Sequence, residues 1–77
     1  MNGQQLLIHY CLGMAGHCIN DMDKVLAYTA IARAAARGDH QKAYDLMYAN
    51  EDLSSKYTET YYNQWRNETN NFKSLEG

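Results

Sequence analysis

The sequence predicts an all-α fold built from three to four helices. The chain of 77 residues contains no proline, the residue that most strongly interrupts helices. Its β-branched residues are scattered, and none lies in a run where apolar and polar residues strictly alternate. Apolar residues recur instead at intervals of three, four and seven positions, the spacing of one face of a helix. We therefore expect a single helical domain over residues 1–77, arranged as a hairpin or small bundle.

The first helix is expected over residues 3–19, with residues 1–5 forming its frayed or capping start. Its apolar stripe consists of Leu7, Cys11, Met14 and Cys18. A second face carries Tyr10, Gly13, His17 and Asn20, with Gly16 beside it. Each glycine inside a helix costs about 1 kcal/mol relative to alanine. This face therefore predicts close approach, either by another backbone or by a flat ligand.

Two further helices are expected over residues 21–37 and 40–49. Asn20 or Asp21 is expected to cap the first of them, Gly38 to end it, and Asp39 to cap the next. The packing positions expected in residues 21–37 are Met22, Val25, Leu26, Tyr28, Thr29, Ile31 and Ala32. Those expected in residues 40–49 are Ala43, Leu46 and Met47.

The last helix is expected over residues 53–75. Its apolar stripe consists of Leu53, Tyr57, Tyr61, Trp65, Phe72 and Leu75, while its other faces are polar. A break at residues 50–54, with Asp52 or Ser54 as the cap, separates it from the preceding helix. Alternatively, these residues only bend the chain and join the last two helices into one long kinked rod.

The small size of the chain predicts that it assembles with itself. A domain of this length buries only about 60% of its unfolded surface, and oligomerisation is a common additional source of stability. Cys11 and Cys18 are about 10 Å apart along one helix, too far for a disulfide, so both are expected to be free thiols. With no signal peptide and no apolar run that could span a membrane, we expect a cytoplasmic protein.

The charge and the aromatic content of the chain limit the kinds of molecule that it is expected to bind. The net charge of −2, without a block of like charges, argues against binding to duplex nucleic acid. The seven tyrosines supply rings that can stack and hydroxyls that can form hydrogen bonds. Trp65 and Arg66 together could stack on a base and bind its phosphate, although a core Trp65 beside a solvated Arg66 is the simpler interpretation. A binder of single-stranded nucleic acid is a weaker interpretation because basic residues are few.

The sequence favours neither a metal site nor catalysis. The possible metal ligands in the first helix are His9, Cys11, His17 and Cys18. Ligands on one helix must lie three or four residues apart, and here the cysteines belong to the core stripe while His9 points elsewhere. The acidic pairs at positions 21 and 23 and at 51 and 52 are explained by capping. No phosphate-binding loop or nucleophile motif is present, so we expect a protein that is not an enzyme and has no cofactor.

The face with Tyr10 and the glycines has two interpretations. In one, the glycines let two copies of this helix approach closely and form a homodimer. In the other, the face is the floor of a ligand site, with Tyr10 stacked on a base and Lys24 contacting a phosphate. The two are compatible, because a ligand can lie on a two-fold axis and contact the same residues of both subunits.

In length, helical pattern and three positions, the chain resembles the phage anti-CBASS sponges. The positions are an early tyrosine on the first helix, a lysine at the start of the second, and a late arginine: Tyr10, Lys24 and Arg66. The resemblance implies a homo-oligomer in the cytoplasm of an infected host cell. It implies at least a dimer, and it favours a hexamer. Such a sponge sequesters cyclic oligonucleotide second messengers without cleaving them and thereby antagonises host antiviral signalling.

The resemblance also implies roles for individual residues. In that family a tyrosine stacks on the bases of a cyclic dinucleotide and a lysine contacts its phosphates, which implies Tyr10 and Lys24, with Gly13 and His17 in the same site. A separate site for cyclic trinucleotides uses an arginine, which implies Arg66. The alternative function is a small helical protein that inhibits a host enzyme or defence complex by masking its surface. Such an inhibitor is expected to present an acidic or apolar exposed patch.

Overall fold

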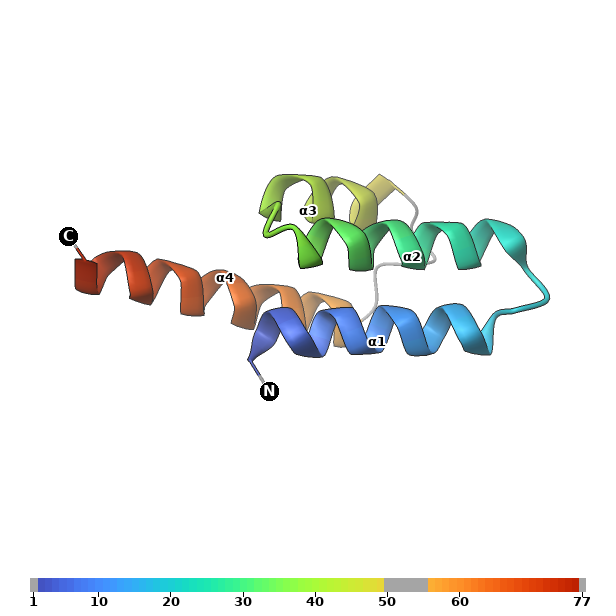
Figure 1. The fold of residues 1–77 in the computed structure, drawn as a ribbon, viewed down its shortest axis with the longest axis horizontal. Coiled ribbons are helices and arrows are strands. Elements are labelled where there is room, and N and C mark those ends of the chain that lie inside the picture. The colour runs from blue at the N-terminus through green and yellow to red at the C-terminus, as the bar shows by residue number, and fades with distance from the viewer. Residues whose placement is uncertain (1, 50–55, 77) are drawn as a thin grey trace.

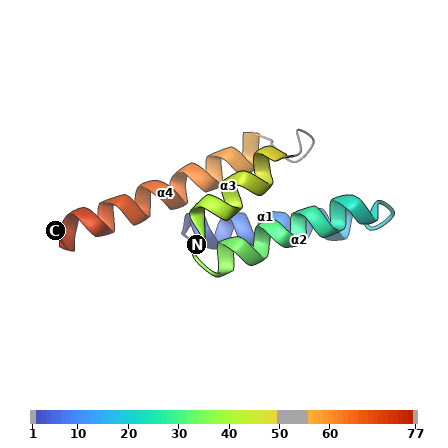
Figure 2. The same ribbon diagram turned by 90° about the horizontal axis from the view of Figure 1, so that it is seen from above.

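A computed structural model describes residues 2–49 and 56–76, and these residues form four α-helices and no strand (Figure 1). The helices are α1 (Gly3–His17), α2 (Met22–Ala36), α3 (His40–Ala49) and α4 (Lys56–Glu76). Helix α2 packs against both α1 and α3, and α4 packs mainly against α1. The C-terminal part of α4 extends past the other helices (Figure 2), which gives the chain a long dimension of 46 Å. The expected all-α fold is confirmed.

The helix ends follow local capping chemistry. Asn2 and Gln5 form a capping box at the start of α1, in which Asn2 Oδ1 accepts from the Gln5 backbone N–H at 2.9 Å. Asp21 is the N-cap of α2, and Asp39 Oδ1 accepts from the backbone N–H of Lys42 at 3.1 Å. Gly38 has φ +76°, the left-handed conformation that ends a helix. The caps expected at these positions are confirmed.

The buried side of α1 differs by a small rotation from the expected stripe. Its buried residues are Gly3, Leu7, Cys11 and Ala15, which are spaced four apart. Met14 and Cys18 are only half-buried and pack at the edge of the core. Because side chains four apart lie almost above one another on a helix, this row makes a narrow contact surface.

The buried side of α2 lies further along the helix than expected. Its buried residues are Tyr28, Ile31, Ala32, Ala34 and Ala35. Val25 and Thr29 are half-buried, whereas Met22 and Leu26 are each 63% exposed, so the prediction that these two pack inside is wrong. Tyr28, Ile31 and Ala32 are buried as expected, and the alanine-rich C-terminal half adds Ala34 and Ala35 to the core.

Helices α3 and α4 lie side by side in opposite directions. Tyr48 Oη donates to Glu59 Oε1 at 3.0 Å, and Tyr62 Oη donates to the carbonyl oxygen of His40 at 3.4 Å. Contacts between residues so far apart in sequence require the chain to reverse, so the alternative of one long kinked rod is wrong. In α3, Ala43 and Met47 are buried as expected and Leu46 is half-buried.

Helix α4 buries Trp65 as expected, but its other buried residues differ from the expected stripe. Its buried side chains are Thr58, Tyr62 and Trp65, whereas Tyr61 is half-buried and Tyr57 is 60% exposed. The row that begins at Thr58 is rotated by about 100° from the row that begins at Tyr57. The expected cap and break at residues 50–54, Leu53, and the side chains of Phe72 and Leu75 lie outside the described residues.

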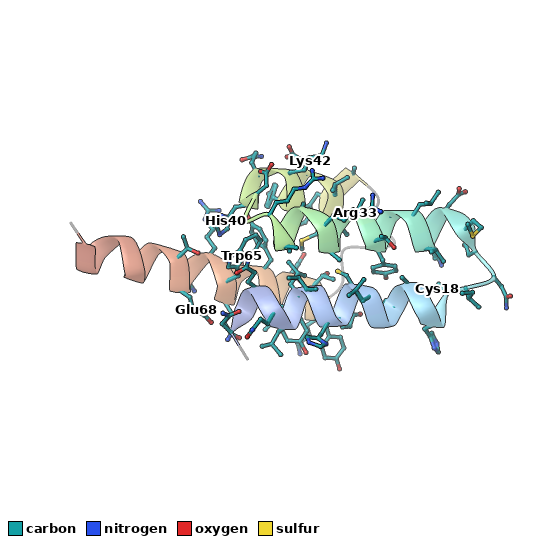
Figure 3. The ribbon with its side chains drawn as sticks, in the orientation of Figure 1. Cys18, Arg33, His40, Lys42, Trp65 and Glu68 are labelled. Carbon is teal, nitrogen blue, oxygen red and sulfur yellow. The ribbon has the colours of Figure 1, made fainter. Side chains whose placement is uncertain are left out.

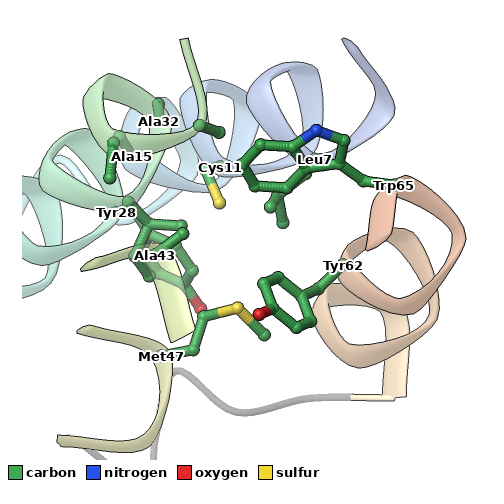
Figure 4. Close-up of a cluster of buried hydrophobic side chains, with 12 residues drawn as sticks. Leu7, Cys11, Ala15, Tyr28, Ala32, Ala43, Met47, Tyr62 and Trp65 are labelled. Carbon is green, nitrogen blue, oxygen red and sulfur yellow. The ribbon is translucent and has the colours of Figure 1, made fainter. Parts of the chain in front are cut away.

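Gly3 sets how closely α4 approaches α1. A Cβ atom placed on Gly3 would lie 2.8 Å from Trp65 Cα and 2.9 Å from the carbonyl carbon of Gln64. The backbone N–H of Gly3 donates to Glu68 Oε1 at 3.1 Å. At this contact the Trp65 ring lies beside Leu7 and Cys11 in the core (Figure 4). The missing side chain at position 3 therefore allows Trp65 to reach the centre of the domain.

Candidate functional site

Three tyrosines meet where α4 begins to pack against α1. Tyr10 lies 5.9 Å from Tyr57 and 5.9 Å from Tyr61 between ring centroids, with interplanar angles of 32° and 62°. We call Tyr10, Tyr57 and Tyr61 the tyrosine cluster. Tyr10 and Tyr61 are half-buried, and Tyr57 is largely exposed. The cluster therefore joins the edge of the core to the surface, and Tyr10 is less open than the sequence suggested.

One face of the half of α1 that follows the tyrosine cluster is exposed to solvent. Gly13, Gly16, His17 and Asn20, which we call the glycine face, are all exposed. A Cβ atom added at Gly13 or Gly16 would meet no heavy atom within 4 Å. Helix α4 does not cover this half because it starts level with Tyr10 and runs towards Gly3. The close approach that the two glycines predict is thus absent within one chain, among the residues described.

Lys24 lies apart from the tyrosine cluster on another element. It is in the first turn of α2, where its backbone N–H donates to the cap Asp21 at 3.4 Å and its side chain is half-buried. Tyr10 is in the middle of α1, about 10 Å along the helix axis from His17, where α1 ends next to the start of α2. Tyr10 and Lys24 are therefore not neighbours on one helix face.

Trp65 and Arg66 do not form a paired binding surface. Trp65 is 4% exposed and stacks on the His40 ring, with centroids 3.8 Å apart and an interplanar angle of 22° (Figure 3). His40 Nε2 is in turn 3.2 Å from Thr69 Oγ1. Arg66 is exposed, about 100° around α4 from Trp65. The interpretation in which Trp65 stacks on a nucleic-acid base is wrong, since both the core and His40 cover its ring.

The cysteines have the environment of structural thiols. Cys11 is fully buried, and burial raises the pKa of its thiol from 9.0 to about 12. A thiol with this pKa stays protonated at neutral pH and is a poor nucleophile. Cys18 is free and half-buried. Within residues 2–49 and 56–76, no three His, Cys, Asp or Glu side chains are grouped so that they could hold a metal ion.

Two surfaces were missed in the sequence. Large apolar side chains are exposed in the second half of α1, in the α1–α2 connection and in the first half of α2: Leu12, Ile19, Met22 and Leu26. A groove between α2 and α3 is bordered by the basic side chains of Arg33, Arg37 and Lys42. The spacing of Arg33 and Arg37, four residues apart, places them on one side of α2, but the position of Lys42 opposite them depends on how α3 folds back.

Comparison with known proteins identifies no relative of this chain. No protein-family model matches the chain, and no curated protein or solved structure is significantly similar to it. In the part of the chain that the structure describes, no helix is long and apolar enough to cross a membrane. Arguments about function therefore rest on the geometry of the side chains.

Proposed function

We propose that the protein binds cyclic oligonucleotides at the tyrosine cluster and the adjoining glycine face, and sequesters them without cleaving them. The observation that carries this proposal is that a partly exposed aromatic cluster lies next to an exposed helix surface on which Gly13 and Gly16 have no side chain. Aromatic rings stack on any base, because every base has a π-face. A helix surface that lacks Cβ atoms lets a flat ligand approach its backbone. Together they suit a planar base attached to a compact phosphate ring.

The complete site requires a second copy of the chain. Tyr10 and Lys24 lie on different elements of one protomer, so a ligand stacked on Tyr10 would receive its phosphate contact from a neighbouring subunit. In a two-fold assembly each subunit contributes the same residues to a symmetric ligand. The open glycine face would then be covered in the assembly, which accounts for the two glycines. His17 and Lys24 would supply polar and charged contacts, and Arg66 would serve a separate site on α4 for cyclic trinucleotides.

The binding energy expected from such a site is adequate for sequestration. Two stacked bases contribute about 1–3 kcal/mol each, and charge-assisted hydrogen bonds to phosphate contribute about 1.5–3 kcal/mol each. A preformed pocket with these contacts reaches sub-micromolar affinity, since each factor of ten corresponds to about 1.4 kcal/mol. The proposal is binding without cleavage, and the buried, protonated Cys11 has no catalytic role in it.

Isothermal titration calorimetry with cyclic di-AMP and cyclic di-GMP tests the site through Tyr10. Tyr10→Leu keeps an apolar side chain at the edge of the core but removes the ring, and it should weaken binding about ten-fold to a hundred-fold. Tyr10→Phe keeps the ring and should bind within about two-fold of the wild type. Tyr44→Leu is the matched control, because Tyr44 is an exposed tyrosine on α3, away from the cluster. Equal binding by Tyr10→Leu and the wild type would contradict the proposed site.

A second candidate function is supported by exposed apolar side chains. Leu12, Ile19, Met22 and Leu26 are exposed, and the exposed acidic residues Asp21 and Asp23 are close to the last three in the sequence. An apolar patch edged by charge is the surface expected of a protein that masks a partner. If the wild type is folded and binds no cyclic nucleotide, while Met22→Ser abolishes inhibition of a host defence complex, this masking function is the better account.

A further inference from the structure

A groove between α2 and α3 concentrates positive charge. It has a volume of about 370 Å³ and is bordered by Arg33, Arg37 and Lys42. These are three of the seven lysines and arginines in a chain whose net charge is −2. Arg33 and Lys42 lie on the same side of the molecule although they come from different helices (Figure 3). A local excess of cations in an acidic protein raises the local concentration of anions.

The acidic residue that borders the groove does not neutralise it. Asp39 is the one acid among the described lining residues, and its carboxylate caps α3 by accepting from the backbone N–H of Lys42. Within residues 2–49 and 56–76, no carboxylate forms an ion pair with Arg33, Arg37 or Lys42. Like charges four residues apart on a helix repel each other, so Arg33 and Arg37 would both gain from a bound anion.

Helix electrostatics explain two of the cations but not the third. Arg33 and Arg37 lie in the last turn and at the C-cap of α2, where the helix dipole favours positive charge. Lys42 lies in the first turn of α3, where the same dipole disfavours positive charge. Helix electrostatics alone therefore do not account for Lys42 on the α3 side of the groove.

The floor of the groove indicates what kind of anion fits. The floor presents an apolar surface formed by Ala30, Ala34 and Leu46. The Thr29 hydroxyl already donates a hydrogen bond to the carbonyl oxygen of Val25 at 2.7 Å. A guanidinium binds phosphate with two parallel hydrogen bonds, and lysine binds it as a point charge. A ligand with phosphate groups and a flat, weakly polar part satisfies both features. The volume lies within the range for small-molecule sites, at its lower end.

We propose that the α2–α3 groove binds a phosphate-bearing small molecule of nucleotide size, with its phosphates between Arg33, Arg37 and Lys42 and its base on the alanine floor. This site is distinct from the tyrosine cluster, which is built by α1 and α4. It therefore goes beyond the proposed function and does not depend on it.

Calorimetric titration of the full chain with ADP tests this site, with adenosine as the uncharged comparison. The double variant Arg33→Gln/Arg37→Gln should lose about ten-fold or more in ADP affinity, and its circular dichroism should be unchanged because both side chains are exposed. Lys56→Gln is the control, since it removes an exposed cation from the start of α4 that belongs to neither proposed site, and it should change ADP affinity by less than about two-fold. Affinity for ADP should also fall as salt rises.

Several outcomes would overturn the proposal. One is the absence of ADP binding by the folded wild type at about 1 mM ligand. Another is equal loss in Lys56→Gln and in the double variant, which would mean non-specific attraction by charge. Binding of a glutamate-rich peptide but not ADP would assign the groove to an acidic protein segment instead.

Discussion

Replacing Gly3 with alanine should destabilise the protein, although alanine is the better helix former. The added Cβ would lie 2.8 Å from Trp65 Cα and 2.9 Å from the Gln64 carbonyl carbon, so α4 must move away from α1. Overpacking of this kind costs about 1–3 kcal/mol, and the shift also weakens the bond from Gly3 to Glu68, in which the acceptor is charged. The gain in helix propensity offsets at most about 1 kcal/mol. We expect a net loss of about 1–3 kcal/mol in the free energy of unfolding.

Urea unfolding followed by far-ultraviolet circular dichroism measures this loss, and Gly13→Ala is the matched control. No heavy atom lies within 4 Å of a Cβ added at Gly13, so at a dilution where the chain is monomeric this variant should gain about 0.5–1 kcal/mol. The same substitution thus has opposite signs at two positions of one helix. For a domain of this size, each kcal/mol shifts the melting temperature by about 4–8 °C. A Gly3→Ala protein as stable as the wild type would refute the close contact between α1 and α4.

Three further predictions concern a thiol, a turn and the glycine face. In a Cys18→Ser variant the remaining Cys11 should react with a thiol reagent only after unfolding, and rapid labelling of the native chain would contradict its burial. The free energy of unfolding of this variant should also fall as pH rises from 9.0 towards 12, because the thiol of the unfolded chain ionises before the buried thiol does. Gly38→Ala should cost about 1 kcal/mol, since φ is +76° and alanine disfavours that conformation; an unchanged urea midpoint would contradict the left-handed turn. Gly13→Leu should reduce the oligomer mass measured by light scattering, while the helix content of the variant stays the same as that of the wild type. An unchanged mass would show that the glycine face is not a subunit contact.

Helix ends were predictable from the sequence because their determinants are local. A cap depends on one side chain and a backbone N–H about three residues away, so Asp21 and Asp39 could be assigned without knowing the fold. Gly38 followed from the same logic, since glycine adopts positive φ at little cost. Whether the chain reverses at residues 50–55 could not be decided, because those residues are compatible with both a bend and a break.

The faces of the helices were harder to predict because they depend on distant contacts. Tyr57 and Tyr61 form as regular a row as Thr58 and Tyr62, and hydropathy does not distinguish the two rows. The choice is made by Gly3, which brings the backbone of Trp65 against α1 and so fixes the rotation of α4. The three residues of the tyrosine cluster were each visible in the sequence, but their meeting follows from that same distant contact.

The measurement that most directly tests the account is equilibrium dialysis of the wild-type chain against cyclic di-AMP, with the retained ligand recovered after denaturation. We expect sub-micromolar retention, because two stacked bases at about 1–3 kcal/mol each act together with phosphate contacts. The recovered ligand should be chemically intact, and light scattering of the same sample should give the mass of an assembly with one ligand shared between protomers. A linear product, or a folded chain that retains no ligand, would contradict the proposed sequestration of cyclic oligonucleotides.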